Sequence, residues 1–291
     1  MHTLEKRQFM SEKIWFVTGT SSGFGQALVN ELIAQKQKIV ATARHLDQIV
    51  HWQKEYKNVY TTSLDVTNHD DVVRAVNEAI KHFGKIDILV NNAGWGYFGS
   101  VEESDESTVR EMMDTNFWGA ADVTRTVLPF FRKQRSGRII NITSVGGLVS
   151  SPAFGFYNAS KFALEGLSSA LAKEVAPLGI YVTNIEPGPY RTKWAGSSHK
   201  AAIETIDDYQ KTAHANANNT ESISGKQDGS PELAAKAIFK LANMTEPPFH
   251  FLTGINAYQR GTALYQETLT EFKNNEADST HLNYGDEDYW K

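Results

Sequence analysis

The 291-residue sequence contains no cysteine. This absence excludes disulfide bonds, thiol catalysis and cysteine metal sites, and it is typical of an intracellular protein. No apolar stretch approaches the roughly 20 residues that a membrane-spanning helix needs, and the N-terminus lacks the hydrophobic region of a signal peptide. We therefore expect a cytoplasmic protein that makes no use of a membrane.

The sequence also lacks a predominance of either charge. Its net charge is -5, from 29 basic and 34 acidic residues that are interspersed along the chain. Such a distribution gives no basic footprint for nucleic acid or for an anionic membrane. The nine histidines form no H-E-x-x-H pattern, so we expect no metal. Met10 is a candidate alternative start, because the first predicted strand begins only at Lys13 or Ile14.

Short apolar runs alternate with helical patterns along the chain. Such runs are typical of parallel strands that are covered by helices on both faces. We expect strands at Ile14–Thr18, Ile39–Ala43, Val59–Ser63, Ile86–Asn91, Arg138–Ile142, Tyr181–Ile185 and His250–Leu252. Between them, Asp70–Phe83 has helical periodicity, with Thr67 and Asn68 as cap candidates and Gly84 as the stop.

With right-handed crossovers, this rhythm predicts an α/β fold in one domain over residues 1–291. The expected architecture is a doubly wound (Rossmann) parallel sheet of about seven strands in the order 3-2-1-4-5-6-7. Ligands of such sheets bind at the carboxyl ends of the strands.

A glycine-rich turn, Thr18–Gly25, follows the first predicted strand and precedes a helical pattern. Glycines allow the backbone to approach a pyrophosphate closely, and the helix N-terminus presents unpaired N–H groups to it. The alternative is a plain glycine-rich turn without a ligand. The cofactor contacts expected from this turn are Gly19, Ser21, Ser22, Gly23, Phe24 and Gly25.

Tyr157 and Lys161 are four positions apart on a predicted helix, and therefore on one face of it. An ammonium near a phenol favours the phenolate, which a tyrosine with a pKa of about 10 needs in order to exchange protons near neutral pH. Taken alone, the pair is explained more simply by a solvated lysine beside a half-buried tyrosine.

Together, the motifs resemble the classical branch of the short-chain dehydrogenase/reductase family. The pattern of that family, T-G-x-x-x-G-x-G, N-N-A-G, a lone Asn, a Ser, Y-x-x-x-K and P-G, is present in order at Thr18–Gly25, Asn91–Gly94, Asn116, Ser144, Tyr157 with Lys161, and Pro187 with Gly188. The resemblance covers about Ile14–Gly254. Within the family, the sequence is similar to bacterial relatives of 17-beta-hydroxysteroid and retinol dehydrogenases. It implies hydride transfer between a nicotinamide cofactor and a carbonyl or secondary alcohol.

The resemblance also implies roles for four catalytic residues. Tyr157 acts as general acid in reduction and general base in oxidation, and Lys161 lowers its pKa and holds the nicotinamide ribose. Ser144 donates a hydrogen bond to the substrate carbonyl oxygen, with Thr143 as the rival. Asn116 corresponds to the asparagine that kinks its helix and holds a water linking the lysine to solvent, and the alternative is an exposed helix asparagine.

Cofactor choice is indicated at the end of the second predicted strand. Ala43 is at the position where an NAD site carries a carboxylate for the ribose 2′-OH. Arg44 can instead pair with a 2′-phosphate, which favours NADP(H) over NAD(H). NAD(H) is the alternative cofactor. The alternative interpretation of Arg44 is a solvated surface charge. Asp65 is expected near the adenine or, alternatively, as a cap of the next helix. The resemblance adds as cofactor contacts Asp65, Val66, Asn92, Ala93, Gly94, Pro187, Gly188, Tyr190 and Thr192, although Tyr190 replaces the usual aliphatic residue of the family.

The substrate side of the predicted site is rich in aromatic residues. Candidates for an apolar wall are Trp95, Tyr97, Phe98, Leu148, Val149, Phe154 and Trp194. They predict a hydrophobic carbonyl substrate, and ordinary core or oligomer contacts are the alternative. Residues 193–230 are polar, with glycine breakers and little strand signal, and predict a mobile lid of one or two helices.

Two features bear on assembly. Residues 267–291 form an acidic extension with late aromatic residues, either a frayed tail or an arm that docks on a neighbouring subunit. The helix that carries Tyr157 has apolar residues on more than one face, which favours a homodimer or homotetramer.

A non-catalytic NADP(H)-binding sensor or interaction protein on the same fold is the alternative to an enzyme. Such a sensor could lose Tyr157 or Ser144 without penalty, so the complete set of Asn116, Ser144, Tyr157 and Lys161 favours turnover. A small-molecule substrate is the partner that this reading requires.

Overall fold

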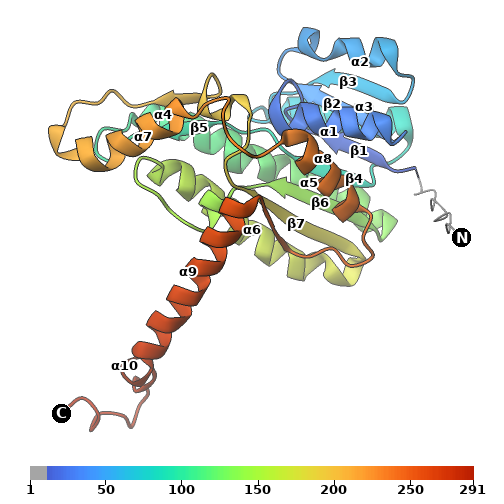
Figure 1. Cartoon of the computed structure of the whole chain (residues 1–291). Helices are drawn as coiled ribbons and strands as arrows, with labels where there is room; N and C mark the ends of the chain where they lie inside the picture. Colours follow the sequence, from blue (N-terminus) through green and yellow to red (C-terminus); the bar gives the residue numbers. More distant parts are fainter. Residues whose placement is uncertain (1–11) are drawn as a thin grey trace, which may run out of the picture.

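The computed structural model describes residues 12–291, so the suggestion about Met10 lies outside the described part. A seven-stranded parallel sheet forms the centre, in the order β3-β2-β1-β4-β6-β7-β9 (Figure 1). Its strands are β1 (Ile14–Val17), β2 (Lys38–Ala43), β3 (Val59–Ser63), β4 (Ile88–Asn91), β6 (Gly137–Ile142), β7 (Ile180–Pro187) and β9 (His250–Thr253). Numbered along the chain, these seven strands have the order 3-2-1-4-5-6-7, which confirms the predicted doubly wound fold.

Helices cover both faces of the sheet, and central strands such as β1 bury apolar side chains on both sides. In β1, Trp15 and Val17 belong to one buried cluster and Phe16 to the other. The first cluster contains residues of α1 (Gly23–Ala34), α2 (Val50–Glu55) and α8 (Pro231–Ala242). The second contains residues of α3 (His69–Phe83), α5 (Ala120–Gln134) and α6 (Gly155–Val175). Single turns of helix, η1 (Leu46–Gln48), η3 (Val145–Gly147) and η4 (Ala176–Leu178), join these elements.

The start and end of α3 follow from local chemistry. The Asn68 side chain accepts a hydrogen bond from the Asp71 N–H at 3.1 Å, and Gly84 ends the helix with a φ of 84°. Asn68, one of the two cap candidates, is therefore the cap. The alternative that Asp65 caps this helix is wrong, because its carboxylate is turned back to accept from Thr67 at 2.7 Å.

A polar ladder crosses the sheet near the carboxyl ends of three strands. Asn91, Asn141 and Asn184 lie side by side in register on β4, β6 and β7. The Asn91 amide donates to Asn141 at 2.9 Å, and the Asn141 amide donates to Asn184 at 3.2 Å and to Ser168 at 2.8 Å. All are buried, so the ladder joins the strands below the site to α6.

Residues 193–230 form a second small layer. Within them lie η5 (Lys193–Ala195), β8 (His199–Ala201), η6 (Asp207–Tyr209), η7 (Gln210–His214) and α7 (Ala215–Ser222). β8 pairs in parallel with β5 (Gly96–Phe98), which sequence analysis missed because three polar or small residues carry no strand periodicity. A buried contact of 2.8 Å between His214 and Glu103 fastens the segment to the body. Its mobility as a lid stays a prediction.

The chain ends in α9 (Ile255–Asn274) and α10 (Glu276–Thr280), and Figure 1 shows α9 extending away from the body. The extension therefore begins as a helix twelve residues before Glu267. Between β5 and α5, a continuous helical stretch is made by α4 (Glu106–Met113) and the π-helical turn η2 (Asp114–Gly119). Within residues 12–291, no helix combines the length and the apolar character needed to cross a membrane.

Candidate active site

A cavity of about 890 Å³ opens where the central strands end. Every predicted site residue lines it except Gly25 and Asn116, which lie behind its wall. The predicted residues in the lining are Gly19, Ser21, Ser22, Gly23, Phe24, Arg44, Asp65, Val66, Asn92, Ala93, Gly94, Ser144, Tyr157, Lys161, Pro187, Gly188, Tyr190 and Thr192. Motifs that are scattered over 170 positions of the sequence thus converge on one space.

The glycine turn and the Asn-Ala-Gly turn hold each other. Gly19 has a φ of +67°, and a Cβ added there would lie 2.8 Å from the Ala93 Cα, so only glycine fits. The Asn92 amide donates to the carbonyl oxygens of Thr18 and Gly19 at 2.9 and 2.8 Å. α1 begins directly after this turn, at Gly23, and its first N–H groups have no partner within the helix. The arrangement suits an anionic ligand.

The end of β2 presents a cation and no carboxylate. Arg44 is exposed and lines the cavity beside Ala43. Within residues 12–291 no ion pair involves Arg44, which leaves its guanidinium available for a ligand of opposite charge.

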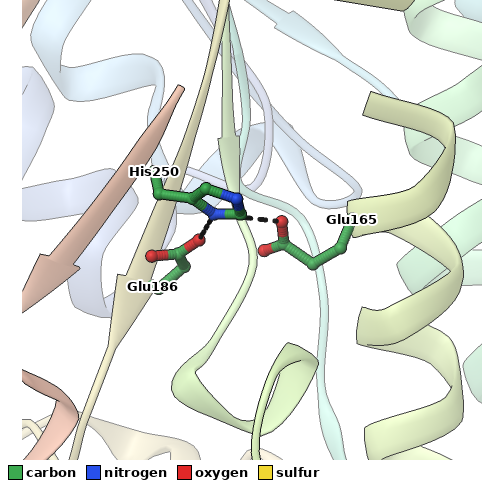
Figure 2. A group of neighbouring side chains, drawn as sticks. All are labelled: Glu165, Glu186 and His250. Atoms are coloured by element: carbon green, nitrogen blue, oxygen red, sulfur yellow. Dashed lines mark hydrogen bonds and ion pairs between the residues drawn. The ribbon is translucent and has the colours of Figure 1, made fainter. Parts of the chain in front are cut away.

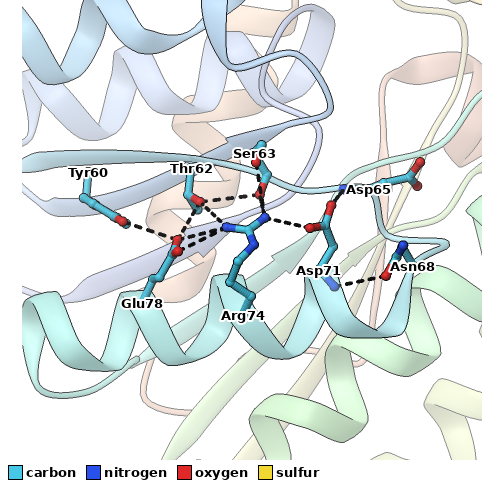
Figure 3. A network of polar contacts seen from close by, with 8 residues as sticks. All are labelled: Tyr60, Thr62, Ser63, Asp65, Asn68, Asp71, Arg74 and Glu78. Atoms are coloured by element: carbon cyan, nitrogen blue, oxygen red, sulfur yellow. Dashed lines mark hydrogen bonds and ion pairs between the residues drawn. The ribbon is translucent and has the colours of Figure 1, made fainter.

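A network of polar side chains fixes the neighbouring loop that carries Asp65 (Figure 3). Arg74 donates to the Ser63 carbonyl and to the Asp71 carboxylate, both at 2.8 Å. Asp71 in turn accepts from the Asp65 N–H at 3.1 Å, and the hydrogen bond from Arg74 holds the pKa of Asp71 below its ordinary value. Asp71 is therefore ionised at neutral pH, and the loop is anchored to α3.

Tyr157 and Lys161 lie on α6 and are both buried, at 7% and 6% exposure. The Lys161 Nζ donates to the Ile142 carbonyl at 3.0 Å and lies 5.9 Å from the centre of the Tyr157 ring. Burial raises the pKa of Tyr157 to about 12, and a hydrogen bond with Ser144 lowers it only in part. Burial lowers the pKa of Lys161 to about 8, and the charge of Glu165 opposes that shift.

The predicted depression of the Tyr157 pKa by Lys161 is therefore not found in this structure. The desolvation of the phenol outweighs any effect of the ammonium, whose nearest hydrogen-bond partner is a backbone carbonyl. As a result, Tyr157 keeps its proton at neutral pH, whereas most Lys161 side chains carry a charge.

Hydrogen bonding separates Ser144 from its rival Thr143. The Thr143 hydroxyl is buried and donates to the Ile185 carbonyl at 2.9 Å, so its proton is already used within the sheet. The Ser144 oxygen accepts from the Gly146 N–H at 2.9 Å, which leaves its own proton for another acceptor. Ser144 is thus the hydroxyl that can serve a ligand beside Tyr157.

Asn116 lies in the π-helical turn η2 and is 1% exposed, so the alternative of an exposed helix asparagine is wrong. Its side chain accepts from the Trp95 N–H at 2.9 Å and donates to the Trp95 carbonyl at 3.0 Å. The amide also donates to Ser160 on α6 at 3.2 Å. Asn116 therefore ties the Asn-Ala-Gly turn to the helix that carries Tyr157.

The aromatic wall is smaller than the sequence suggested. Trp95, Val149, Phe154 and Trp194 line the cavity, and the Trp194 ring centre is 5.1 Å from that of Tyr157. The other three candidates, Tyr97, Phe98 and Leu148, are buried outside the lining, and Tyr97 and Phe98 belong to the core under residues 193–230.

Sequence reasoning missed the polar part of the wall. It includes residues from the segment before α6, from α6 itself, from residues 193–230 and from α9, among them Ser151, Asn158, Lys193, Asn216, Asn219, Thr220, Gln227, Asn256 and Arg260. They belong to no motif, and only the folding of these segments over the sheet brings them together. Arg260 donates to Ser151 at 2.8 Å.

The segment after β7 approaches the glycine turn from the other side. The ring of Tyr190 lies 4.8 Å from that of Phe24, and a Cβ on Gly23 would be 3.5 Å from Thr192. Tyr190 therefore makes an aromatic contact between two walls of the cavity.

Two buried carboxylates, Glu165 and Glu186, lie close to the exposed His250 (Figure 2). Glu165, one turn after Lys161 on α6, approaches His250 to 3.9 Å, and Glu186 of β7 contacts the same imidazole nitrogen at 2.5 Å. Burial raises the pKa of both carboxyl groups, that of Glu186 to about 8. Between Glu12 and Lys291 this is the one group of three residues whose atoms are close enough to hold a metal ion, and none of the three lines the cavity.

Comparison with known proteins gives consistent results. Residues 13–202 match the family model described as short chain dehydrogenase. Oxidoreductase BOA17 of Botryotinia fuckeliana is 36% identical over 250 residues, which cover 85% of this chain and 90% of that protein. The 3-ketodihydrosphingosine reductase of Bacteroides thetaiotaomicron is 34% identical over 245 residues, 84% of this chain and 89% of that one.

Solved structures agree with these relatives. The crystal structure of a short-chain dehydrogenase from Streptomyces avermitilis superposes with a TM-score of 0.86 at 32% identity, and covers 93% of this chain and 100% of that one. The closed form of a serine dehydrogenase complexed with NADP+ superposes with a TM-score of 0.72 at 26% identity, over 82% and 94% of the two chains.

Proposed function

Because the chain belongs to the short-chain dehydrogenase family and is an oxidoreductase of that family, we propose that it transfers a hydride between NADP(H) and a carbonyl or secondary alcohol. The observation that carries this proposal is the convergence of Ser144, Tyr157 and Lys161 with the glycine turn on one cavity. When bound, the nicotinamide supplies or accepts the hydride.

The protonation states in the site favour carbonyl reduction. The Ser144 hydroxyl and the Tyr157 phenol bind the carbonyl oxygen, and Tyr157 gives it a proton as negative charge develops there. Since burial holds the pKa of Tyr157 at about 12, the phenol is protonated and ready to act as the acid. Lys161, with a pKa of about 8, is charged at neutral pH and stabilises the phenolate that remains.

The cofactor fits the residues of the other half of the cavity. The N-terminus of α1 holds the pyrophosphate, with Ser21, Ser22 and Gly23 around it. Arg44 pairs with the 2′-phosphate, which supports NADP(H) over NAD(H), since Ala43 offers no oxygen to a ribose hydroxyl. Asp65 and Val66, which also line the cavity, would contact the adenine. Further contacts come from Asn92, Ala93, Gly94, Lys161, Pro187, Gly188, Tyr190 and Thr192.

The substrate is a hydrophobic carbonyl compound. The aromatic rings of Trp95, Phe154 and Trp194 near Tyr157 support this proposal. The relative that acts on 3-ketodihydrosphingosine supports it further, because its name describes a ketone. We also propose that the protein works as a homodimer or homotetramer in the cytoplasm.

The test is the consumption of NADPH and, separately, of NADH with aliphatic, aromatic, quinone and steroid-like carbonyls. We expect turnover of at least one hydrophobic carbonyl with NADPH and a much lower kcat/KM with NADH. Binding of both cofactors without turnover of any carbonyl would instead favour the sensor. Higher efficiency with NADH would show that Arg44 does not select the cofactor.

A further inference from the structure

The projecting helix α9 carries an exposed apolar stripe that no other described segment covers. Five large side chains are more than half exposed: Ile255 (74%), Tyr258 (61%), Tyr265 (54%), Leu269 (53%) and Phe272 (67%). By contrast, Ala257 and Gly261 of the same helix are buried, and a Cβ on Gly261 would lie 3.0 Å from Leu252 of β9. One side of the first turns therefore packs on the body, and the stripe faces outward.

The spacing of the stripe is that of a helix made to pair with another helix. Together with Thr262, its positions advance by 3, 4, 3, 4 and 3 residues, which is the a/d pattern of a heptad repeat over two and a half heptads. Beyond Leu269 every residue of α9 is exposed, so the end of the helix has no support from the body. The unsupported end, residues 269–274, is much shorter than the roughly 12–15 residues that an isolated helix needs in water.

The amount of exposed surface also points to a partner. A free large apolar or aromatic side chain presents roughly 150–250 Å², so the stripe exposes on the order of 600 Å². That is the upper end of the apolar patches found on monomers. If two such stripes faced each other, on the order of 1,200 Å² would be buried, which is the lower end of stable interfaces.

The charges decide what kind of partner fits. Positions that flank the stripe are neutral along most of its length, at Gln259, Gly261, Gln266 and Thr268, so two copies meet without repulsion. The end of the chain, from Glu267, carries seven carboxylates and two lysines: Glu267, Glu271, Glu276, Asp278, Asp286, Glu287 and Asp288 against Lys273 and Lys291. An anionic membrane would repel this segment.

We propose that the α9 stripe is an interface at which α9 of a second copy of this chain docks. This pairing would also steady the active-site cavity, because Asn256 and Arg260 of the same helix line it and Arg260 is bonded to Ser151. The docking itself does not depend on which substrate or cofactor is used.

The experiment is sedimentation equilibrium of the full chain as wild type and as the double variant Leu269→Glu, Phe272→Glu. Both residues are exposed, so folding of the single chain is expected to survive, and circular dichroism checks this. The matched control is Glu267→Gln with Asn274→Glu. It alters two residues of the same part of α9 that lie outside the stripe, and the net charge of the chain stays the same. A second variant, Tyr258→Glu with Tyr265→Glu, tests the first half of the stripe independently.

We expect the wild type and the control to associate alike, and each stripe variant to associate roughly 100-fold more weakly or to lose half of its assembled mass, because two large apolar side chains lose their partner. Equal assembly of wild type and both stripe variants would overturn the proposal, as would a monomeric wild type. Stripe-dependent binding to phosphatidylserine vesicles by a monomeric wild type would assign the stripe to a membrane. NADPH turnover is measured in parallel, so that failure of the docking proposal can be distinguished from failure of the proposed function.

Discussion

Replacement of Gly25 by alanine adds a single carbon atom and tests whether the contact between the glycine turn and the Asn-Ala-Gly turn requires glycine at this position. A Cβ at Gly25 would lie 2.4 Å from the Gly19 carbonyl oxygen and 2.6 Å from the Asn92 amide nitrogen. Both atoms belong to the contact that joins the two turns, in which Asn92 donates to Gly19 at 2.8 Å. Because one of the neighbours is backbone, the methyl group cannot be accommodated by a side-chain rotation.

Two effects of opposite sign set the magnitude. Alanine is favoured over glycine in a helix by about 1 kcal/mol. An extra methyl group in a well-packed site typically costs about 1–3 kcal/mol. We expect a net loss of up to about 2 kcal/mol in the free energy of unfolding. We also expect NADPH to bind at least roughly tenfold more weakly, because the methyl group displaces the turn that holds the pyrophosphate. A tenfold change in Kd corresponds to a loss of about 1.4 kcal/mol of binding free energy.

The assays are urea denaturation and titration of NADPH by fluorescence, with Gly166→Ala as the matched control. Gly166 is an exposed residue of α6 whose added Cβ would meet nothing within 4 Å, so alanine there should stabilise the protein by about 0.5–1 kcal/mol and leave binding unchanged. If Gly25→Ala behaved like this control in both assays, the crowding argument would be refuted.

Three further predictions concern other parts of the site. Arg44→Ala should raise the KM for NADPH at least about tenfold and leave that for NADH almost unchanged; equal effects on both would rule out a 2′-phosphate contact. Because burial lowers the pKa of Lys161 to about 8, its charged form prevails below that pH, so reduction should slow as the pH rises through about 8; the decline should be absent from the residual activity of Lys161→Met. Asn141→Leu leaves the buried Asn184 oxygen without its donor and should lower the free energy of unfolding by about 1–3 kcal/mol; an unchanged urea midpoint would contradict the polar ladder.

The sequence carried enough information for the sheet and for most of the cavity lining. Strands buried on both faces are recognisable as apolar runs, and Gly19, Asn92 and Tyr157 lie in motifs whose spacing reflects the contacts they make. The order of the strands is that of the doubly wound fold, which the alternation of strands and helices and the glycine-rich turn indicate.

Features that depend on distant parts of the chain were not accessible in this way. The pKa of Tyr157 is set by how deeply the phenol is buried, which sequence spacing does not report. Glu165, Glu186 and His250 come from three separate elements, and Arg260 reaches the cavity only because α9 starts beside it. The short strand β8 is held by its partner β5, on which His199 stacks against Phe98, and its own residues have no preference for a strand.

The central claim, that Tyr157 donates the proton while NADPH supplies the hydride, is tested most directly by comparing Tyr157→Phe with the wild type on a hydrophobic ketone. The variant lacks only the phenolic oxygen, and NADPH titration shows whether the cofactor still binds. We predict that the wild type consumes NADPH and forms the alcohol, and that the variant binds NADPH with an affinity within about threefold but turns over about 10²–10⁴-fold more slowly. A variant that reduces the ketone at the rate of the wild type would contradict this account.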